Sequence, residues 1–233
     1  MRKGFTLVEL SIVLVIIGLL IGGILVGQSM ISSAKINKVV KQLSQYDIVV
    51  VNFREKYRQL PGDSTKFPVV VGTTQNDDKK LNGYDTGRFW YHLSLGIGLK
   101  NQLGVSYSAF DPYTANLNKS TCPQFDIEQN PLEPCLSVGS YWQVSTTTLA
   151  NMYLYGSGKP ALGLAGVIRP TDSLALDTKI DNGIANTGLV GSYSAGCNTG
   201  AAYNISDSSF ACMLSILLGA GSGMANGIDP LFN

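Results

Sequence analysis

A long apolar run followed by a periodic apolar stripe occupies the first quarter of the chain. From Leu10 to Val26 the sequence contains no charged residue, and a helix of about 20 apolar residues spans a bilayer core. After Gly27, apolar residues recur at alternating spacings of four and three, which is typical of one helix face. This stripe consists of Val39, Leu43, Tyr46, Val50, Phe53, Tyr57 and Leu60. We predict one helix from Phe5 to about Arg58, whose stripe packs on the protein's own sheet.

The charged residues of the second half of this helix are assigned to the faces outside the stripe. They are Lys38, Lys41, Asp47, Arg54, Glu55, Lys56 and Arg58. Leu60-Pro61-Gly62-Asp63 predicts the helix end, because proline disfavours helical geometry at the preceding residue and glycine favours a turn. A coiled coil is the alternative reading of the stripe, but the pattern lasts only about three heptads and carries aromatic residues.

The remaining residues, 61–233, mix short β-prone runs with connections rich in Gly, Asn, Ser and Thr. Four runs are predicted strands: 67–71, 141–144, 152–155 and 211–218. Asn82-Gly83 and Gly156-Ser157-Gly158 are read as turns. Short helices are predicted at 87–93 and at 171–180, the latter with Thr171 as N-cap and Asn182-Gly183 as its stop. The fold class is therefore α+β.

Charge is low and nearly balanced, with 17 Lys+Arg against 16 Asp+Glu. Nucleic-acid binding needs clustered excess Lys and Arg, so we expect no nucleic-acid partner. The positive charge is uneven: Arg2 and Lys3 form a short basic leader, the predicted helix is basic from Lys35 to Arg58, and no Lys or Arg follows Lys179. The acidic tail and the basic helix predict a charge contact between neighbouring heads, with a simply solvated surface as the alternative.

Glu9 is a carboxylate at the start of the apolar segment. Such a charge costs roughly 2.5–3.5 kcal/mol at the centre of a membrane helix and calls for a partner. No Lys or Arg lies between Lys3 and Lys35. At membrane depth the available cations are a new α-amino group, formed if the chain is cut before Phe5, or a group on another subunit.

Gly4-Phe5-Thr6-Leu7-Val8-Glu9, placed after the basic leader and before the apolar run, resembles the class III signal of type IV pilins and type II secretion pseudopilins. The resemblance implies cleavage by prepilin peptidase between Gly4 and Phe5 and N-methylation of Phe5. It also implies that Glu9 pairs with the Phe5 amine of a neighbouring subunit during assembly. The implied fold is the pilin fold, a long helix laid against an antiparallel β-sheet head.

The predicted organisation has four parts: a cleaved leader at 1–4, a transmembrane and filament-core helix at 5–30, its amphipathic continuation at 31–60, and a globular head at 61–233. Positive charge before the apolar segment places the N-terminus in the cytoplasm, although Lys35, Lys38 and Lys41 beyond the segment weaken this bias. We expect a single-pass inner-membrane protein that later joins a periplasmic or extracellular filament.

The four cysteines are Cys122, Cys135, Cys197 and Cys212, and none forms a C-x-x-C pair. Three connectivities are possible. Sequential pairing closes two loops of similar size, and we favour it; buried free thiols are the alternative. Disulfides persist in the oxidising compartments outside the cytoplasm.

Two runs are weak calcium candidates. Asp78, Asn82 and Gly83 match the first, fifth and sixth positions of an EF-hand loop, but Lys80 and Phe89 occupy the third and twelfth, so the ligand set fails. The second run contains Asp172, Asp177, Asp181 and Asn182. Related pseudopilins carry a calcium loop, but its ligands do not map onto these positions. We expect no cofactor, with calcium left open.

The sequence predicts no enzyme. His92 is the only histidine and lies among aromatic residues, which favours a packed side chain over a catalytic base, and no G-x-S-x-G motif occurs. The predicted function is a structural subunit of a type IV pilus or type II secretion pseudopilus. Its partners are other pilins, prepilin peptidase, an inner-membrane assembly platform and the lipid bilayer before assembly. One alternative is a minor priming or tip subunit, since the resemblance implies that a head of residues 61–233 is large for a major pilin. Another is a membrane-anchored extracytoplasmic binding domain or hydrolase.

Overall fold

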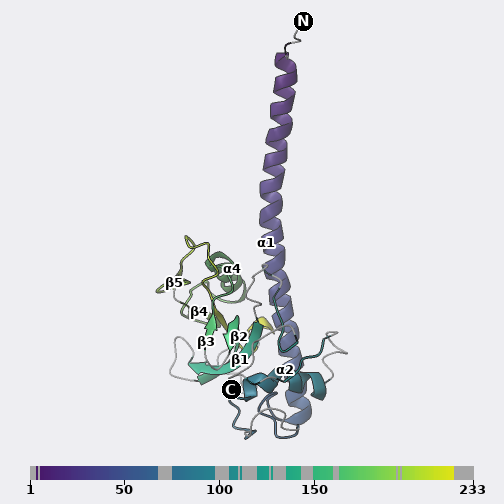
Figure 1. The fold of residues 1–233 in the computed structure, drawn as a ribbon, viewed down its shortest axis with the longest axis vertical. Helices are drawn as coiled ribbons and strands as arrows, with labels where there is room; N and C mark the ends of the chain where they lie inside the picture. The colour runs from purple at the N-terminus through teal and green to yellow at the C-terminus, as the bar shows by residue number, and fades with distance from the viewer. Residues whose placement is uncertain are drawn as a thin grey trace.

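The structure is a computed structural model that describes Gly4 and residues 6–67, 75–97, 105–109, 111, 120–125, 127, 135–142, 149–159, 163–192, 194 and 196–222. One long helix, α1 (Leu7–Tyr57), forms a stalk whose second half lies against a globular head (Figure 1). At 51 residues this helix is about 76 Å long. The N-terminal half extends away from the head as a single bare rod (Figure 1).

α1 ends where the sequence predicts. Arg58 adopts a left-handed conformation with φ 60° and donates its backbone N–H to the carbonyl of Arg54 at 2.7 Å. A left-handed residue at this position is a common helix stop, although glycine is the usual occupant. The following Leu60 is buried, so the chain turns back immediately onto the core.

The predicted stripe faces the head. Six of its seven members are buried in the core: Val39, Leu43, Tyr46, Val50, Phe53 and Leu60. Tyr57 is partly buried, and Ile36 and Val49 of the same helix are buried as well. Burying such side chains contributes about 1.5–3 kcal/mol each, so this face anchors the helix. The prediction that Asp47 lies off the stripe is wrong: it is completely buried. Asp47 lies four residues after Leu43 and three before Val50, and this spacing places it on the same face.

The head is built on one antiparallel sheet. Its strands are β1 (Cys135–Trp142), β2 (Leu149–Lys159), β3 (Gly163–Ala165), β4 (Val190–Ser192) and β7 (Leu214–Leu217). The order is β1-β2-β7-β4, with β3 paired to β2 off this path, and all pairs are antiparallel. A two-stranded ribbon joins β5 (Asn198–Thr199) to β6 (Ala202–Tyr203). A long helix with this sheet confirms the predicted α+β class.

Three shorter helical segments complete the described head: α2 (Asp85–Gly96), α4 (Pro170–Ile180) and the 3-10 turn η2 (Ala220–Ser222). α2 contains the predicted helix 87–93 and buries Phe89, Trp90 and Leu93. The Trp90 indole N–H donates to the carbonyl of Leu136 on β1 at 2.7 Å. This hydrogen bond ties α2 to the edge of the sheet.

The predicted cap of α4 is wrong. Arg169 is the N-cap and Pro170 opens the helix, because proline fits the first turn, where its missing N–H needs no partner. Thr171 therefore lies inside the first turn. The helix ends at Ile180, immediately before the predicted Asn182-Gly183 stop, and Gly183 has φ +73°.

Strand predictions were correct in part. Residues 152–155 lie in β2, and 214–217 form β7. The run 141–144 shares only residues 141 and 142 with β1, where they are the last two residues of the strand. Residues 143–148 lie outside the described residues. The turn predicted at Gly156-Ser157-Gly158 is wrong, because these residues continue β2 and pair with β1 and β3. In the run 67–71, Phe67 lies in a bend, and 68–71 fall outside the described residues.

Candidate functional site

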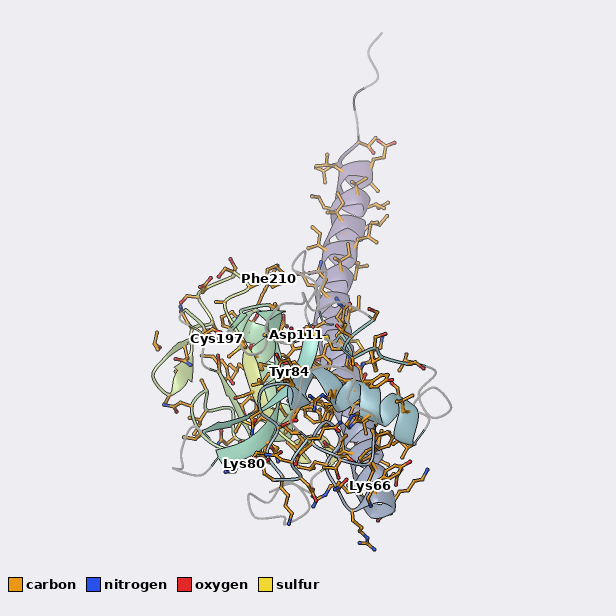
Figure 2. All side chains as sticks on the ribbon, turned by 60° about the horizontal axis from the view of Figure 1, so that its bottom comes forward. Lys66, Lys80, Tyr84, Asp111, Cys197 and Phe210 are labelled. Atoms are coloured by element: carbon orange, nitrogen blue, oxygen red, sulfur yellow. A yellow bond between two sulfur atoms is a disulfide. The ribbon has the colours of Figure 1, made fainter. Side chains whose placement is uncertain are left out.

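The first half of α1 exposes apolar side chains along its whole length. Leu7, Leu10, Leu19 and Met30 are 58% exposed or more, and the most apolar window of the helix has no buried residue. In Figure 2 the side chains at the N-terminal end of this half project outward on both sides of the helix, and no other described part of the chain lies beside them there. A water-soluble helix does not present such a surface, so this half is suited to lipid or to other subunits.

Glu9 lies at the N-terminal end of this bare half and closes a reciprocal cap with Thr6. One carboxylate oxygen of Glu9, Oε2, accepts from the Thr6 backbone N–H at 2.8 Å and from the Thr6 hydroxyl at 2.9 Å. The Thr6 hydroxyl oxygen in turn accepts from the Glu9 N–H at 3.3 Å. This is a capping box, which satisfies orphan donors at a helix start.

Sequence reasoning missed this role of Thr6. It treated Glu9 as a carboxylate whose partner must come from a new amine or another chain, although Thr6-x-x-Glu9 before an apolar run is itself the capping-box signature. Gly4 is exposed, with open space around its Cα, and Phe5 lies outside the described residues. The geometry at the predicted cleavage bond is therefore described only on its Gly4 side.

The fold and this surface define a class: an α+β head carried on a helix whose first half is bare, apolar and long enough to cross a membrane. Residues 1–25 match the family model of the prokaryotic N-terminal methylation motif. No curated protein and no solved structure matches the chain. The matched segment is the class III prepilin signal of type IV pilins and pseudopilins.

This signal supports a pilin-like or pseudopilin precursor and indicates a structural protein. It implies processing by prepilin peptidase and polymerisation with pilins. The bare helix and the signal together are consistent with a membrane-anchored pilin. The match ends at residue 25, so the head is known from its own structure alone.

Two disulfides close loops in the head. Cys122 forms a disulfide with Cys135 at the start of β1, and Cys197 forms a disulfide with Cys212. The backbone of Cys212 also forms an isolated β-bridge with Ile168. This is the sequential pairing that the sequence favours. Cross-links that close loops of this length contribute on the order of 3 kcal/mol in the chain-entropy model. The second disulfide joins the residue just before β5 to the segment that precedes β7.

The carboxylates at the first weak calcium candidate accept hydrogen bonds from backbone N–H groups. An Asp78 carboxylate oxygen accepts from the Lys80 N–H at 2.9 Å, and the Asn82 N–H donates to Asp85 at 3.3 Å. The buried Asp63 accepts from the Asp77 and Lys79 N–H groups at 2.9 and 2.8 Å. These carboxylates hold the backbone of the loop.

In the second weak calcium candidate, Asp177 and Asp181 accept hydrogen bonds from different partners. Asp177 is buried and accepts from the Tyr203 hydroxyl at 2.9 Å and the Gly183 N–H at 3.1 Å. Burial raises the pKa of Asp177 and that of Tyr203. Asp181 accepts instead from the Leu189 N–H at 2.5 Å. Among the described residues no group of three or more His, Cys, Asp or Glu side chains is placed to hold a metal ion.

His92 is a packed histidine. Its Nδ1 accepts from the Gly62 N–H at 3.0 Å, and its ring stacks on Phe67 with a centroid distance of 4.9 Å. Burial, with a smaller contribution from Arg88, lowers the pKa of His92 to about 4. About two turns earlier in α2, burial raises the pKa of Asp85 to about 7, although the Arg88 guanidinium lies 3.7 Å from its carboxylate. The His92 ring is therefore neutral and structural.

Proposed function

We propose that this chain is a structural subunit of a type IV pilus or type II secretion pseudopilus, polymerised through α1. The observation that carries the proposal is the division of α1: residues before Ile36 contribute only the partly exposed Gly27 to burial, while the stripe beyond Ile36 is buried in the head. A helix that leaves about 40 Å of apolar surface uncovered needs lipid before assembly and other helices after it.

The proposed order of events follows from the signal and the charges. The subunit spans the inner membrane once, with its N-terminus in the cytoplasm, and prepilin peptidase cuts between Gly4 and Phe5. The cut removes Arg2 and Lys3, which leaves 15 basic against 16 acidic side chains, and it creates an amine at Phe5. Glu9 then pairs with that amine on a neighbouring subunit. Both Thr6 hydrogen bonds go to Oε2 of Glu9, so Oε1 remains available as an acceptor.

Glu9→Gln tests this proposal. Glutamine retains the capping box, since Gln serves at this position as well as Glu, but it removes the charge. We expect the variant to reach the membrane and be cleaved like the wild type, while its amount in sheared filaments falls about tenfold or more, because a charge pair in apolar surroundings is worth more than about 1.4 kcal/mol.

Ser11→Ala is the matched control. Ser11 lies on the same exposed helix, and its hydroxyl donates to the Val8 carbonyl one turn earlier at 2.9 Å, so this change should leave assembly intact. A membrane-anchored binding domain or hydrolase would be absent from sheared filaments, so absence of the wild type from them would exclude the filament role. Normal incorporation of Glu9→Gln would instead refute the pairing of Glu9 with the Phe5 amine.

A minor priming or tip subunit is the second candidate, favoured by the size of the head. Quantitative mass spectrometry of purified filaments separates the two: a major subunit makes up most of the filament mass. A minor subunit is present in a few copies, and its deletion still abolishes filament formation.

A further inference from the structure

A hollow lies in the corner where α1 leaves the head. It has a volume of about 170 Å³ and is lined by Gln28, Ile31, Ser32, Lys35, Ile127 and Asp172. Four of these residues come from the emerging helix, while Asp172 comes from the first turn of α4, which packs against α1. In Figure 1, α4 lies on the side of the head nearer the bare part of the helix.

The helix fixes the depth of this hollow relative to a membrane. No charged residue lies between Glu9 and Lys35, and 1.5 Å per residue puts Lys35 about 39 Å along the axis from Glu9. A bilayer with its headgroup regions is about 40–45 Å thick. With Glu9 at the cytoplasmic boundary, Lys35 and the hollow lie in the headgroup layer of the outer leaflet.

The lining offers both signs of charge to one ligand. Lys35 is exposed and supplies an ammonium group, Asp172 supplies a carboxylate, and Gln28 and Ser32 are exposed and add polar groups. Burial raises the pKa of Asp172, while Arg169 and Lys35 act in the opposite direction, so Lys35 and Asp172 interact electrostatically. A purely anionic ligand would meet repulsion from Asp172, whereas a zwitterion would satisfy both groups.

We infer that this hollow binds the headgroup of a zwitterionic phospholipid, phosphatidylethanolamine, with the phosphate on Lys35 and the primary ammonium on Asp172. Since a water needs roughly 10–15 Å³ of such space, the hollow has room for the about eight non-hydrogen atoms of phosphoethanolamine. A choline headgroup fits less well, because its quaternary ammonium has no N–H to donate to Asp172. The bound headgroup would hold the head at a fixed depth and rotation until extraction into the filament. This inference rests on the proposed membrane insertion of α1.

The test uses the full chain in bilayers of phosphatidylcholine that contain either phosphatidylethanolamine or phosphatidylglycerol, with lipids retained after gentle extraction counted by native mass spectrometry. We expect the wild type to retain phosphatidylethanolamine, and Lys35→Gln and Asp172→Asn each to reduce that retention about tenfold, as loss of one charge-assisted contact implies. Lys41→Gln is the control, since Lys41 is also exposed on the same helix but does not line the hollow, and this variant should retain the lipid.

Three outcomes would overturn the inference: equal retention by all four proteins, preference for phosphatidylglycerol, or a cross-link from Lys35→Cys to a second subunit in the unassembled membrane pool. Carbonate extraction of the same samples distinguishes failure of this inference from failure of the proposed function. A chain that resists carbonate but shows no lipid preference refutes the headgroup site alone, whereas a chain that carbonate releases refutes membrane insertion and the site with it. Circular dichroism spectra that match the wild type would show that the variants fold.

Discussion

Glu9 and Asp47 lie on the same helix in opposite surroundings. Glu9 is exposed and bound to Thr6, whereas Asp47 is completely buried and accepts from the Tyr153 hydroxyl at 3.0 Å and the Gly219 N–H at 2.9 Å. Asp47 therefore joins α1 to β2 and to the turn after β7. A buried charge is tolerated only when it is well hydrogen-bonded, so this carboxylate specifies one rotation of α1 against the sheet.

We expect Asp47→Ala to destabilise the protein by about 3 kcal/mol or more, because it leaves two buried donors unsatisfied. Tyr153→Phe removes only one donor and should cost about 1 kcal/mol. Thermal unfolding of the full chain in detergent measures both. Ile48→Ala on the exposed side of α1 is the control and should have little effect; an Asp47→Ala protein as stable as this control would contradict the assigned contact.

The shifted pKa values of Asp85 and His92 predict opposite pH dependences of the folding stability. Burial raises the pKa of Asp85 from 3.8 to about 7, so between those values the folded state holds a proton that the unfolded state has released, and stability falls as pH rises. Burial lowers the pKa of His92 from 6.5 to about 4, so the unfolded state binds the extra proton there, and stability falls as pH drops. In the wild type the two contributions oppose each other.

Single variants separate the contribution of Asp85 from that of His92. Relative to the wild type, Asp85→Asn should become progressively more stable as pH rises from 4 to 7, with a slope of at most about 1.4 kcal/mol per pH unit. His92→Asn, which retains an acceptor for Gly62, should gain relative stability as pH falls from 6.5 to 4. Melting temperatures recorded across this range provide the check. Difference curves that do not vary with pH would refute both shifts.

At the scale of elements, the helices α1, α2 and α4 were predictable and the shortest strands were not. The length and the buried face of α1 follow from the spacing of its apolar residues, and α2 follows from a compact aromatic run. β3, β4, β5 and β6 have two or three residues each, which is too short for a period-two pattern to register. Gly156 to Gly158 have turn composition, but Gly156 pairs with β1 and the next two residues pair with β3, which keeps all three in β2. Glu9 was found from its charge, whereas its partner Thr6 needed the capping pattern.

The turn η2 packs directly on α1, and Gly221 is the contact point. A Cβ built at Gly221 would lie 2.6 Å from the Leu43 Cβ and 2.7 Å from the Ser44 backbone nitrogen. The helix backbone cannot yield at that distance, so Gly221→Ala should destabilise the head by about 1–3 kcal/mol. Gly22→Ala, where nothing lies within 4 Å, is the matched control for unfolding of the head. Equal unfolding midpoints in denaturant would show that η2 does not press on α1.

At the scale of the whole molecule, α1 has two halves in different surroundings: the second half is buried in the head and the first half is bare. Its second half is a core helix of the head, joined to the sheet by Asp47 and to the described C-terminal turn by Gly221. Its first half adds nothing to that core. Residues 10–34 carry no charge, which suits a segment meant for lipid or for neighbouring helices.

This division predicts that the head folds without the bare half of α1. A chain beginning at Gln28 retains every buried residue, since the first of these is Ile36, and it should be soluble and monomeric. Its melting temperature should match that of the full chain in detergent within a few degrees, because the removed segment contributes no packing to the head. Size-exclusion chromatography and calorimetry measure the two properties. A large loss of stability would mean that residues 7–27 support the head, and the assignment of this half to membrane and filament contacts would then fail.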